Sequence, residues 1–110
     1  MSRRDPVRAL RHILDHAREI RRLIRGRKRE DLDKDRLLNL ALVRLLEIVG
    51  EAAIRVPPEE QRDRPAIPWS QLVGLRNRLI HGYDDVDFDI LWEIVTKDIP
   101  ALIKAVEKKG

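Results

Sequence analysis

Apolar residues recur at helical spacing along most of this chain. Asp5 is expected to be the N-cap of a helix, and Pro6 follows it at the first helical position. Apolar side chains then follow every three or four residues as far as Gly26, at Val7, Leu10, Ile13, Leu14, Ala17, Ile20 and Ile24. The pattern predicts a first helix that begins at Pro6 and ends at this glycine.

A second and more apolar helix is expected from about Leu37 to Arg55, with Asp31 or Asp33 as its cap. It is apolar almost all the way round, as a central or interface helix is. A narrow polar stripe interrupts it, at Arg44, Glu47 and Glu51. This stripe fits either a salt-bridge network with solvent at its edge or polar support for a site on a facing helix.

The third and fourth helices complete the pattern. The stretch VPPEEQRDRPAIP ends the second helix, and a third begins at Pro68 or Trp69 and reaches about His81. Asp87 caps a fourth helix, in which Pro100 should kink the helix or restart it behind Asp98. Four helices with short links predict an all-α fold, an antiparallel four-helix bundle, and one domain over residues 1–110.

Length and composition narrow the class of protein. A chain of 110 residues has room for a single core that is marginal as an isolated monomer, so we expect a partner subunit. Cysteine is absent from the sequence, which fits a reducing compartment. We find neither an apolar signal-peptide core in MSRRDPVRAL nor an unbroken run of about 20 apolar residues. We therefore expect a cytoplasmic protein that does not enter a membrane.

Charge is distributed unevenly along the chain. Residues 1–30 hold eleven Lys or Arg and four acids, so this segment carries +7 and the remainder −3 of the net +4. Such a segment can neutralise phosphates of a nucleic acid, or form an exposed helix face balanced by acids elsewhere. A DNA-binding module is disfavoured, because the sequence has no short helix-turn-helix unit and its basic residues surround the first helix.

The stretch GLRNRLIHGYDD carries the most unusual chemistry. At about 100° per residue, Arg76 falls inside the apolar arc of the third helix, which Trp69, Leu72, Val73, Leu75, Leu79 and Ile80 form. A guanidinium there needs an acidic partner, which Glu47 or Glu51 could provide, or else a wet cleft or an anionic ligand. His81 precedes Gly82 and can equally be a helix C-terminal residue that interacts with the helix dipole.

Taken together, these residues resemble a known signature. An arginine, four residues, a histidine at a helix end and a tyrosine two positions later is similar to the motif of the HEPN ribonucleases, and more closely to that of the HepT-type toxins. The stretches LLNLALVRLLEIVGEAA, IPWSQLVGLRNRLIHGY and VDFDILWEIVTKDIPAL resemble the family's second, active-site and last helices.

The resemblance implies a homodimer in which two copies of the motif helix face each other across a cleft. It implies metal-independent endoribonuclease activity there, with RNA as substrate and no cofactor. His81 would transfer protons and Arg76 would stabilise the phosphorane. Asn77, beside the motif arginine, and Glu47 of the polar stripe would support them. Because residues five apart point about 140° apart on a regular helix, a second subunit or a loosened helix end must complete the site.

Tyr83 has two interpretations. It can be an amphipathic ring that covers the helix end with its hydroxyl in water. By the resemblance, it is the residue that a minimal nucleotidyltransferase antitoxin adenylylates, so that an anionic nucleotide blocks the cleft of the toxin. A cognate antitoxin is then a second partner besides RNA.

Two further alternatives stay open at this point. A non-catalytic relative would keep the bundle and act as a nucleotide-binding or scaffold subunit of a nucleotidyltransferase complex. Metal-dependent hydrolysis is disfavoured, because acids around a helix start are ordinarily caps and dipole partners. The acids concerned are Asp84, Asp85, Asp87 and Asp89.

Overall fold

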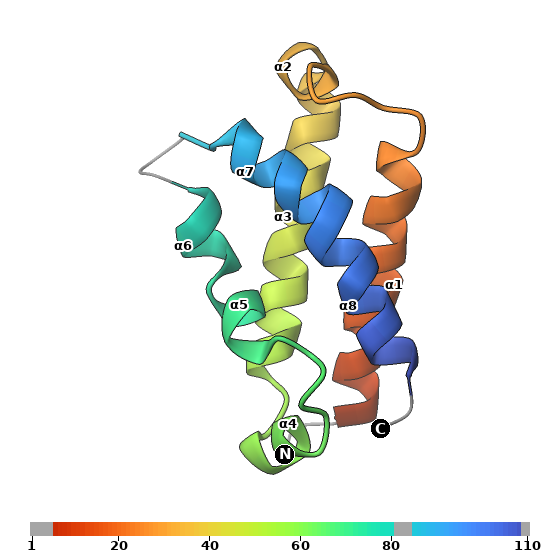
Figure 1. Cartoon of the computed structure of the whole chain (residues 1–110). Coiled ribbons are helices and arrows are strands. Elements are labelled where there is room, and N and C mark those ends of the chain that lie inside the picture. The colour runs from red at the N-terminus through yellow and green to blue at the C-terminus, as the bar shows by residue number, and fades with distance from the viewer. Residues whose placement is uncertain (1–5, 81–84, 109–110) are drawn as a thin grey trace.

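The computed structural model describes residues 6–80 and 85–108, and within them the chain is helical (Figure 1). The predicted all-α antiparallel bundle is confirmed. The elements in chain order are α1 (Pro6–Ile24), α2 (Asp31–Lys34), α3 (Arg36–Ile54), α4 (Pro58–Arg62), α5 (Trp69–Val73), α6 (Leu75–Leu79), α7 (Phe88–Glu93), the π-helix η1 (Ile94–Asp98) and α8 (Ile99–Glu107).

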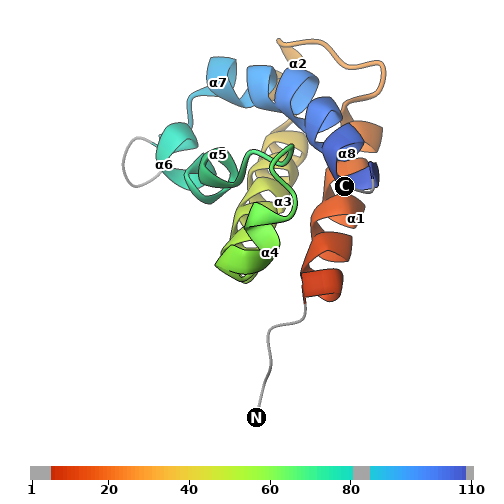
Figure 2. The same cartoon turned by 60° about the horizontal axis from the view of Figure 1, so that its bottom comes forward.

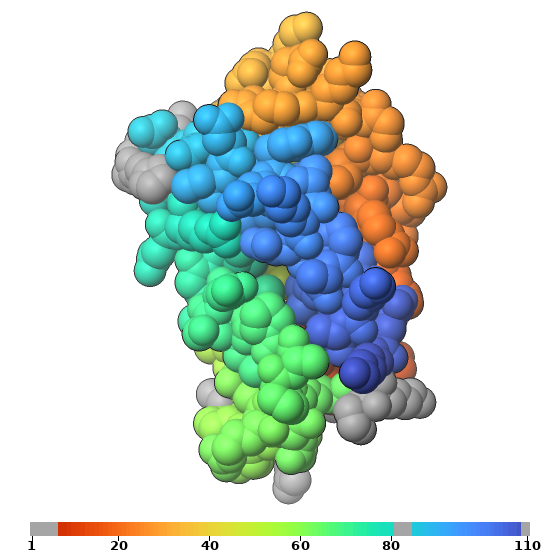
Figure 3. Space-filling model, in the orientation of Figure 1, coloured from red at the N-terminus to blue at the C-terminus, as the bar shows by residue number. Residues whose placement is uncertain are grey.

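Helix α3 is the central element of the bundle. It lies between α1 on one side and α5 and α6 on the other, and α7, η1 and α8 run obliquely across one face of this layer (Figure 1, Figure 2). Side chains of α5–α6 and of the C-terminal helices meet along that face (Figure 3). The core combines leucines and isoleucines from every long helix, including the fully buried Ile13, Leu42, Leu46, Leu91 and Ile99. Within the described residues we find no helix long and apolar enough to cross a bilayer.

The boundaries of α1 and α3 follow local signals. Gly26, with a φ of 74°, ends the first helical segment as predicted, because a left-handed conformation is readily adopted only by glycine. The prediction that Asp31 or Asp33 caps the second long helix is wrong. The Asp35 side chain accepts a hydrogen bond from the amide of Leu38, whereas Asp31 accepts one from Lys28 at the start of the separate short helix α2.

The expected continuous third helix, from Pro68 or Trp69 to His81, is instead two short helices. The chain breaks at Gly74, where φ is −88° and ψ is 3°, and α5 and α6 meet at an angle there. Trp69 fixes the start of α5, because its indole N–H donates to the carbonyls of Gln61 and Arg64, each at 3.1 Å. The linker before it also holds an unpredicted helical turn, α4.

The last helix has the predicted start and an unexpected middle. Asp87 caps it, because its carboxylate accepts hydrogen bonds from the amides of Asp89 and Ile90. Pro100 has no N–H to donate, and the turn before it adopts π geometry, in which the amide of Ile99 donates to the carbonyl of Ile94. The helix thus passes the proline by widening one turn, and α8 continues behind Asp98.

Candidate active site

The arginine of the motif lies on α6, which ends at Leu79, two positions before the motif histidine in the sequence. Arg76 and Asn77 are exposed on this helix. His81 and Tyr83, with Gly82 and Asp84, lie outside the described residues. On either side of them the chain is anchored: Ile80 forms a β-bridge with Val86, and the amide of Asp87 donates to the carbonyl of Leu79 at 3.0 Å. The end of α6 and the start of α7 therefore lie side by side.

Arg76 does not sit within an apolar arc, so that prediction is wrong. The buried side of α5 and α6 is narrower than predicted: Leu72, Leu75 and Leu79 are buried, whereas Val73 is 45% exposed and Arg76 lies at the surface. Its guanidinium forms no ion pair with any residue in the described part of the chain. The suggested acidic partners are placed elsewhere, because Glu47 lies 3.6 Å from Arg44 and Glu51 is exposed without such a contact to Arg76.

Arg78, two residues further along α6, is the residue that sequence reasoning missed. Its guanidinium donates to Glu93 at 2.8 Å and to Asp98 at 3.0 Å. These two carboxylates come from α7 and η1, so one side chain ties the motif helix to the C-terminal helices. On a regular α-helix, residues five apart point about 140° apart, and the π turn between Glu93 and Asp98 is what lets both reach one guanidinium. We call this contact the Arg78 clamp.

The two arginines of α6 point in different directions. Two residues on a helix are separated by about 200°, so Arg76 lies about 160° around α6 from Arg78. Arg78 faces α7 and η1, where its charge is neutralised by two acids. Arg76 therefore lies on the opposite side of α6, one residue before Asn77, and no acid among the described residues pairs with its positive charge.

Several acids and several arginines of the basic segment serve as caps and ion pairs. Asp87 caps α7, and Asp89 accepts a hydrogen bond from Arg29 at 2.8 Å. That bond, with a second from Arg29 to Asp33, raises the pKa of the Arg29 guanidinium. Arg18 pairs with Glu107 in the same manner. Part of the N-terminal charge is thus balanced by acids elsewhere, and the described residues contain no group of three ligands that could hold a metal.

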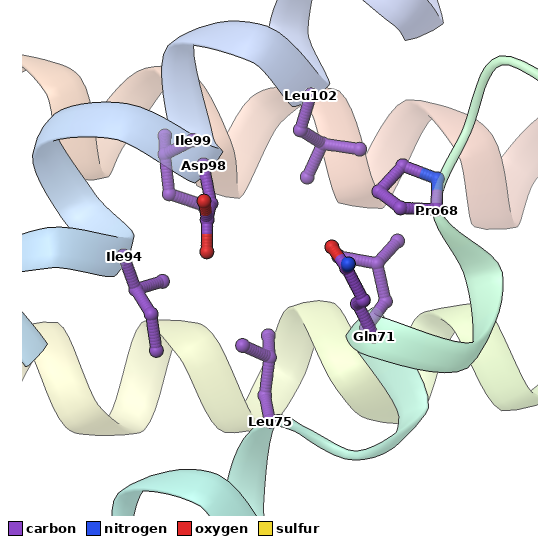
Figure 4. A pocket seen from close by; sticks show the side chains of 8 residues that line it. Pro68, Gln71, Leu75, Ile94, Asp98, Ile99 and Leu102 are labelled. Carbon is purple, nitrogen blue, oxygen red and sulfur yellow. The ribbon is translucent and has the colours of Figure 1, made fainter. Parts of the chain in front are cut away.

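A small apolar cavity lies between α5–α6 and the C-terminal helices, next to Asp98 of the Arg78 clamp (Figure 4). Leu75, Ile94, Ile99 and Leu102 line it, and Asp98 of the clamp reaches its edge. Its volume of about 10 Å³ is near that of one water molecule, far below the several hundred Å³ of a small-molecule site. This cavity is therefore too small to hold a nucleotide.

Comparison with known proteins agrees with the motif. The family model described as Ribonuclease HepT-like matches residues 13–108. A Caldanaerobacter subterraneus subsp. tengcongensis protein named "Putative RNase" is 39% identical over 90% of this chain and 88% of its own length. A "Putative RNase" of Methanocaldococcus jannaschii is 36% identical over 97% and 98%, and a "Probable ribonuclease HepT" of Thermococcus cleftensis is 42% identical over 72% of each. We found no matching solved structure.

Proposed function

The chain belongs to the family of HepT-like ribonucleases, and we propose that it is a metal-independent endoribonuclease that cleaves RNA with Arg76 and His81. The observation that carries this proposal is the state of Arg76. An arginine whose charge meets no acid among the described residues, and which stands at the surface, is free to bind a phosphate. Arg78, two residues away, is not free to bind a phosphate, because its guanidinium already forms ion pairs with two carboxylates.

The proposed chemistry needs only proton transfer and charge stabilisation. The 2′-oxygen forms a bond to phosphorus, and the bond from phosphorus to the 5′-oxygen breaks. A base takes the proton of the 2′-hydroxyl, and an acid gives one to the leaving oxygen. The products are a 2′,3′-cyclic phosphate and a 5′-hydroxyl. His81 is the group that transfers protons, and Arg76 stabilises the negative charge that develops on the phosphorane.

A second copy of the chain completes this site. One chain supplies a single motif histidine, whereas base and acid catalysis together call for two proton-transfer groups. In the proposed homodimer the two motif helices face each other, so that each cleft receives residues from both chains. Asn77, exposed beside Arg76, supports the substrate, and Glu47 supports the cleft from α3. Mixing Arg76→Ala chains with His81→Ala chains tests this, because a shared cleft regains one intact pair and regains activity.

We further propose that this ribonuclease is the toxin of a toxin–antitoxin pair. A minimal nucleotidyltransferase antitoxin transfers AMP to the hydroxyl of Tyr83, with pyrophosphate leaving from ATP. The nucleotide fills the cleft, and its phosphate competes with the RNA phosphate for Arg76. The support for this step is the position of Tyr83, two residues after the motif histidine, in a chain of the HepT-like family.

The proposal is tested with purified protein and total RNA in EDTA. We expect the wild-type protein to cleave and His81→Ala to lose at least about a hundredfold in rate, as the loss of an acid–base group does. Arg62→Ala, at an exposed arginine on α4, is the matched control and should cleave like the wild type. A folded, dimeric wild-type protein that leaves RNA intact would indicate instead a non-catalytic scaffold subunit.

A further inference from the structure

Within the part of the chain that the structure describes, no helix packs on one side of the central helix α3. Helices α1 and α5–α6 flank it, and α7–α8 cross a third side (Figure 2). The remaining side carries large apolar residues at the surface: Leu37 is 81% exposed, Leu40 48% and Ile54 55%. All three lie on the same side of α3, so together they give this side of the helix apolar ends that a packed partner would cover.

The charged residues of the polar stripe share this uncovered face. Together with the exposed apolar residues they follow one another at steps of three and four, in the order Leu37, Leu40, Arg44, Glu47, Glu51, Ile54. Steps of three and four are the spacing of the contact positions in a two-stranded coiled coil. We call this set of six residues the α3 stripe.

The order of residues in the α3 stripe is complementary to itself when reversed. About the midpoint between Leu45 and Leu46, Arg44 and Glu47 are equally distant and opposite in charge. The two apolar ends, Leu37 and Ile54, are also equally distant from it. If a second copy of α3 lies antiparallel on the first, each arginine therefore meets a glutamate and each apolar end meets an apolar end.

The geometry points to a two-fold interface in which α3 of one chain packs antiparallel against α3 of a second copy. Two reciprocal ion pairs form at its centre, from Arg44 of each chain to Glu47 of the partner subunit. Within one chain these residues are 3.6 Å apart and Arg44 is largely exposed, so the contact is weak and readily exchanged. Leu40 lies opposite Glu51 at the next layer, where the long glutamate can keep its carboxylate at the solvent edge.

Self-complementarity selects a second copy over an unrelated partner. A two-fold interface uses the same patch on both chains, so it requires a patch that matches its own reverse, whereas a different protein places no such demand. The stripe also borders the motif helix, because Gly50 of α3 touches α5 at the carbonyl of Leu72 and Val73 beside it is 45% exposed. This inference rests on the proposed homodimeric ribonuclease and assigns its contact surface.

Charge reversal tests the arrangement directly. Arg44→Glu and Glu47→Arg should each raise the dimer dissociation constant on the order of tenfold or more, because like charges then face each other twice. The double variant Arg44→Glu/Glu47→Arg should dimerise like the wild type. An equimolar mixture of the two single variants should form a heterodimer, because each chain then presents charges opposite to those of its partner. Sedimentation equilibrium measures all four, and Arg62→Glu on α4 is the control for a charge change off the stripe.

A second variant keeps the result independent of folding. Leu37 contributes little to the core of one chain because it is so exposed, so Leu37→Asp should leave the monomer folded by circular dichroism and abolish the dimer. Two results would overturn the proposed interface. The first is an Arg44→Glu protein with the dimer dissociation constant of the wild type, and the second is a mixture of the two single variants that forms no heterodimer. Failure of the proposed ribonuclease function would give a different result. The protein would then form a dimer that responds to the charge reversals as predicted, but it would not cleave RNA.

Discussion

Replacing Gly50 by alanine should destabilise the bundle where α3 crosses α5. A Cβ atom at this position would lie 2.9 Å from the carbonyl oxygen of Leu72, a distance that carbon and oxygen do not tolerate without movement. The obstructing atom belongs to the backbone, so no side-chain rotation relieves the contact. Helix α5 must move away from α3, and α6 with Arg76 follows it.

The change in the free energy of unfolding caused by Gly50→Ala is the balance of two opposing effects. At an unhindered position inside a helix, alanine is more stable than glycine by roughly 0.5–1 kcal/mol. Overfilling a packed contact costs about 1–3 kcal/mol. The net expectation is a loss between about 0 and 2.5 kcal/mol, which for a domain of this size lowers Tm by up to roughly 15 °C.

Urea and thermal unfolding at a fixed protein concentration measure this change. Ala101→Gly, at an exposed position on α8, is the control, because it reports the helix-propensity effect of glycine without a close neighbour. A Gly50→Ala protein that is more stable than the wild type would refute the reasoning, since it would show that propensity exceeds the clash. We also expect slower RNA cleavage, because the motif helix is displaced.

Three further changes probe the site and its framework. Arg78→Ala should reduce kcat for RNA more than KM and lower stability by only about 1 kcal/mol, because the clamp is partly exposed; Arg78→Lys should restore part of kcat. Asp35→Ala should cost about 1 kcal/mol in urea unfolding through loss of the α3 cap, whereas the same cost at Asp33→Ala would contradict this assignment. Tyr83→Phe should still cleave RNA but gain no AMP by mass spectrometry when co-expressed with the nucleotidyltransferase, and silencing of this variant would contradict the role of its hydroxyl.

The parts of the fold that follow from local chemistry were predictable. The start of α1 at Pro6, its end at Gly26 and the cap at Asp87 each depend on a few adjacent residues, and the sequence shows all of them. The long helix α3 was predicted to within a residue at each end, because apolar residues recur along its whole length and Pro57 follows it. Its cap was misplaced because Asp31, Asp33 and Asp35 are equally good candidates, and only the turn geometry selects among them.

The direction of Arg76 was not predictable, for a physical reason. The helical wheel placed Val73 in the apolar arc, but Val73 is 45% exposed, and the buried side holds Leu72, Leu75 and Leu79 without Arg76. The width of the buried side depends on the helices that pack against it, which a helical wheel does not represent. The Arg78 clamp was not predictable for a related reason. It depends on the π turn between Glu93 and Asp98, which α-helical periodicity does not represent. A glycine in the middle of the motif helix and a proline two residues after Asp98 were the available signals.

Arg76 is proposed to be a catalytic residue and not a structural one, and a single preparation of Arg76→Ala tests this role most directly. The initial rate of RNA cleavage and the Tm are measured on the same preparation, beside the wild type. Because the guanidinium is exposed and pairs with no acid in the described residues, we predict a rate at least about a hundredfold lower and an unchanged Tm. A wild-type rate, or a lost rate accompanied by a lowered Tm, would contradict the account.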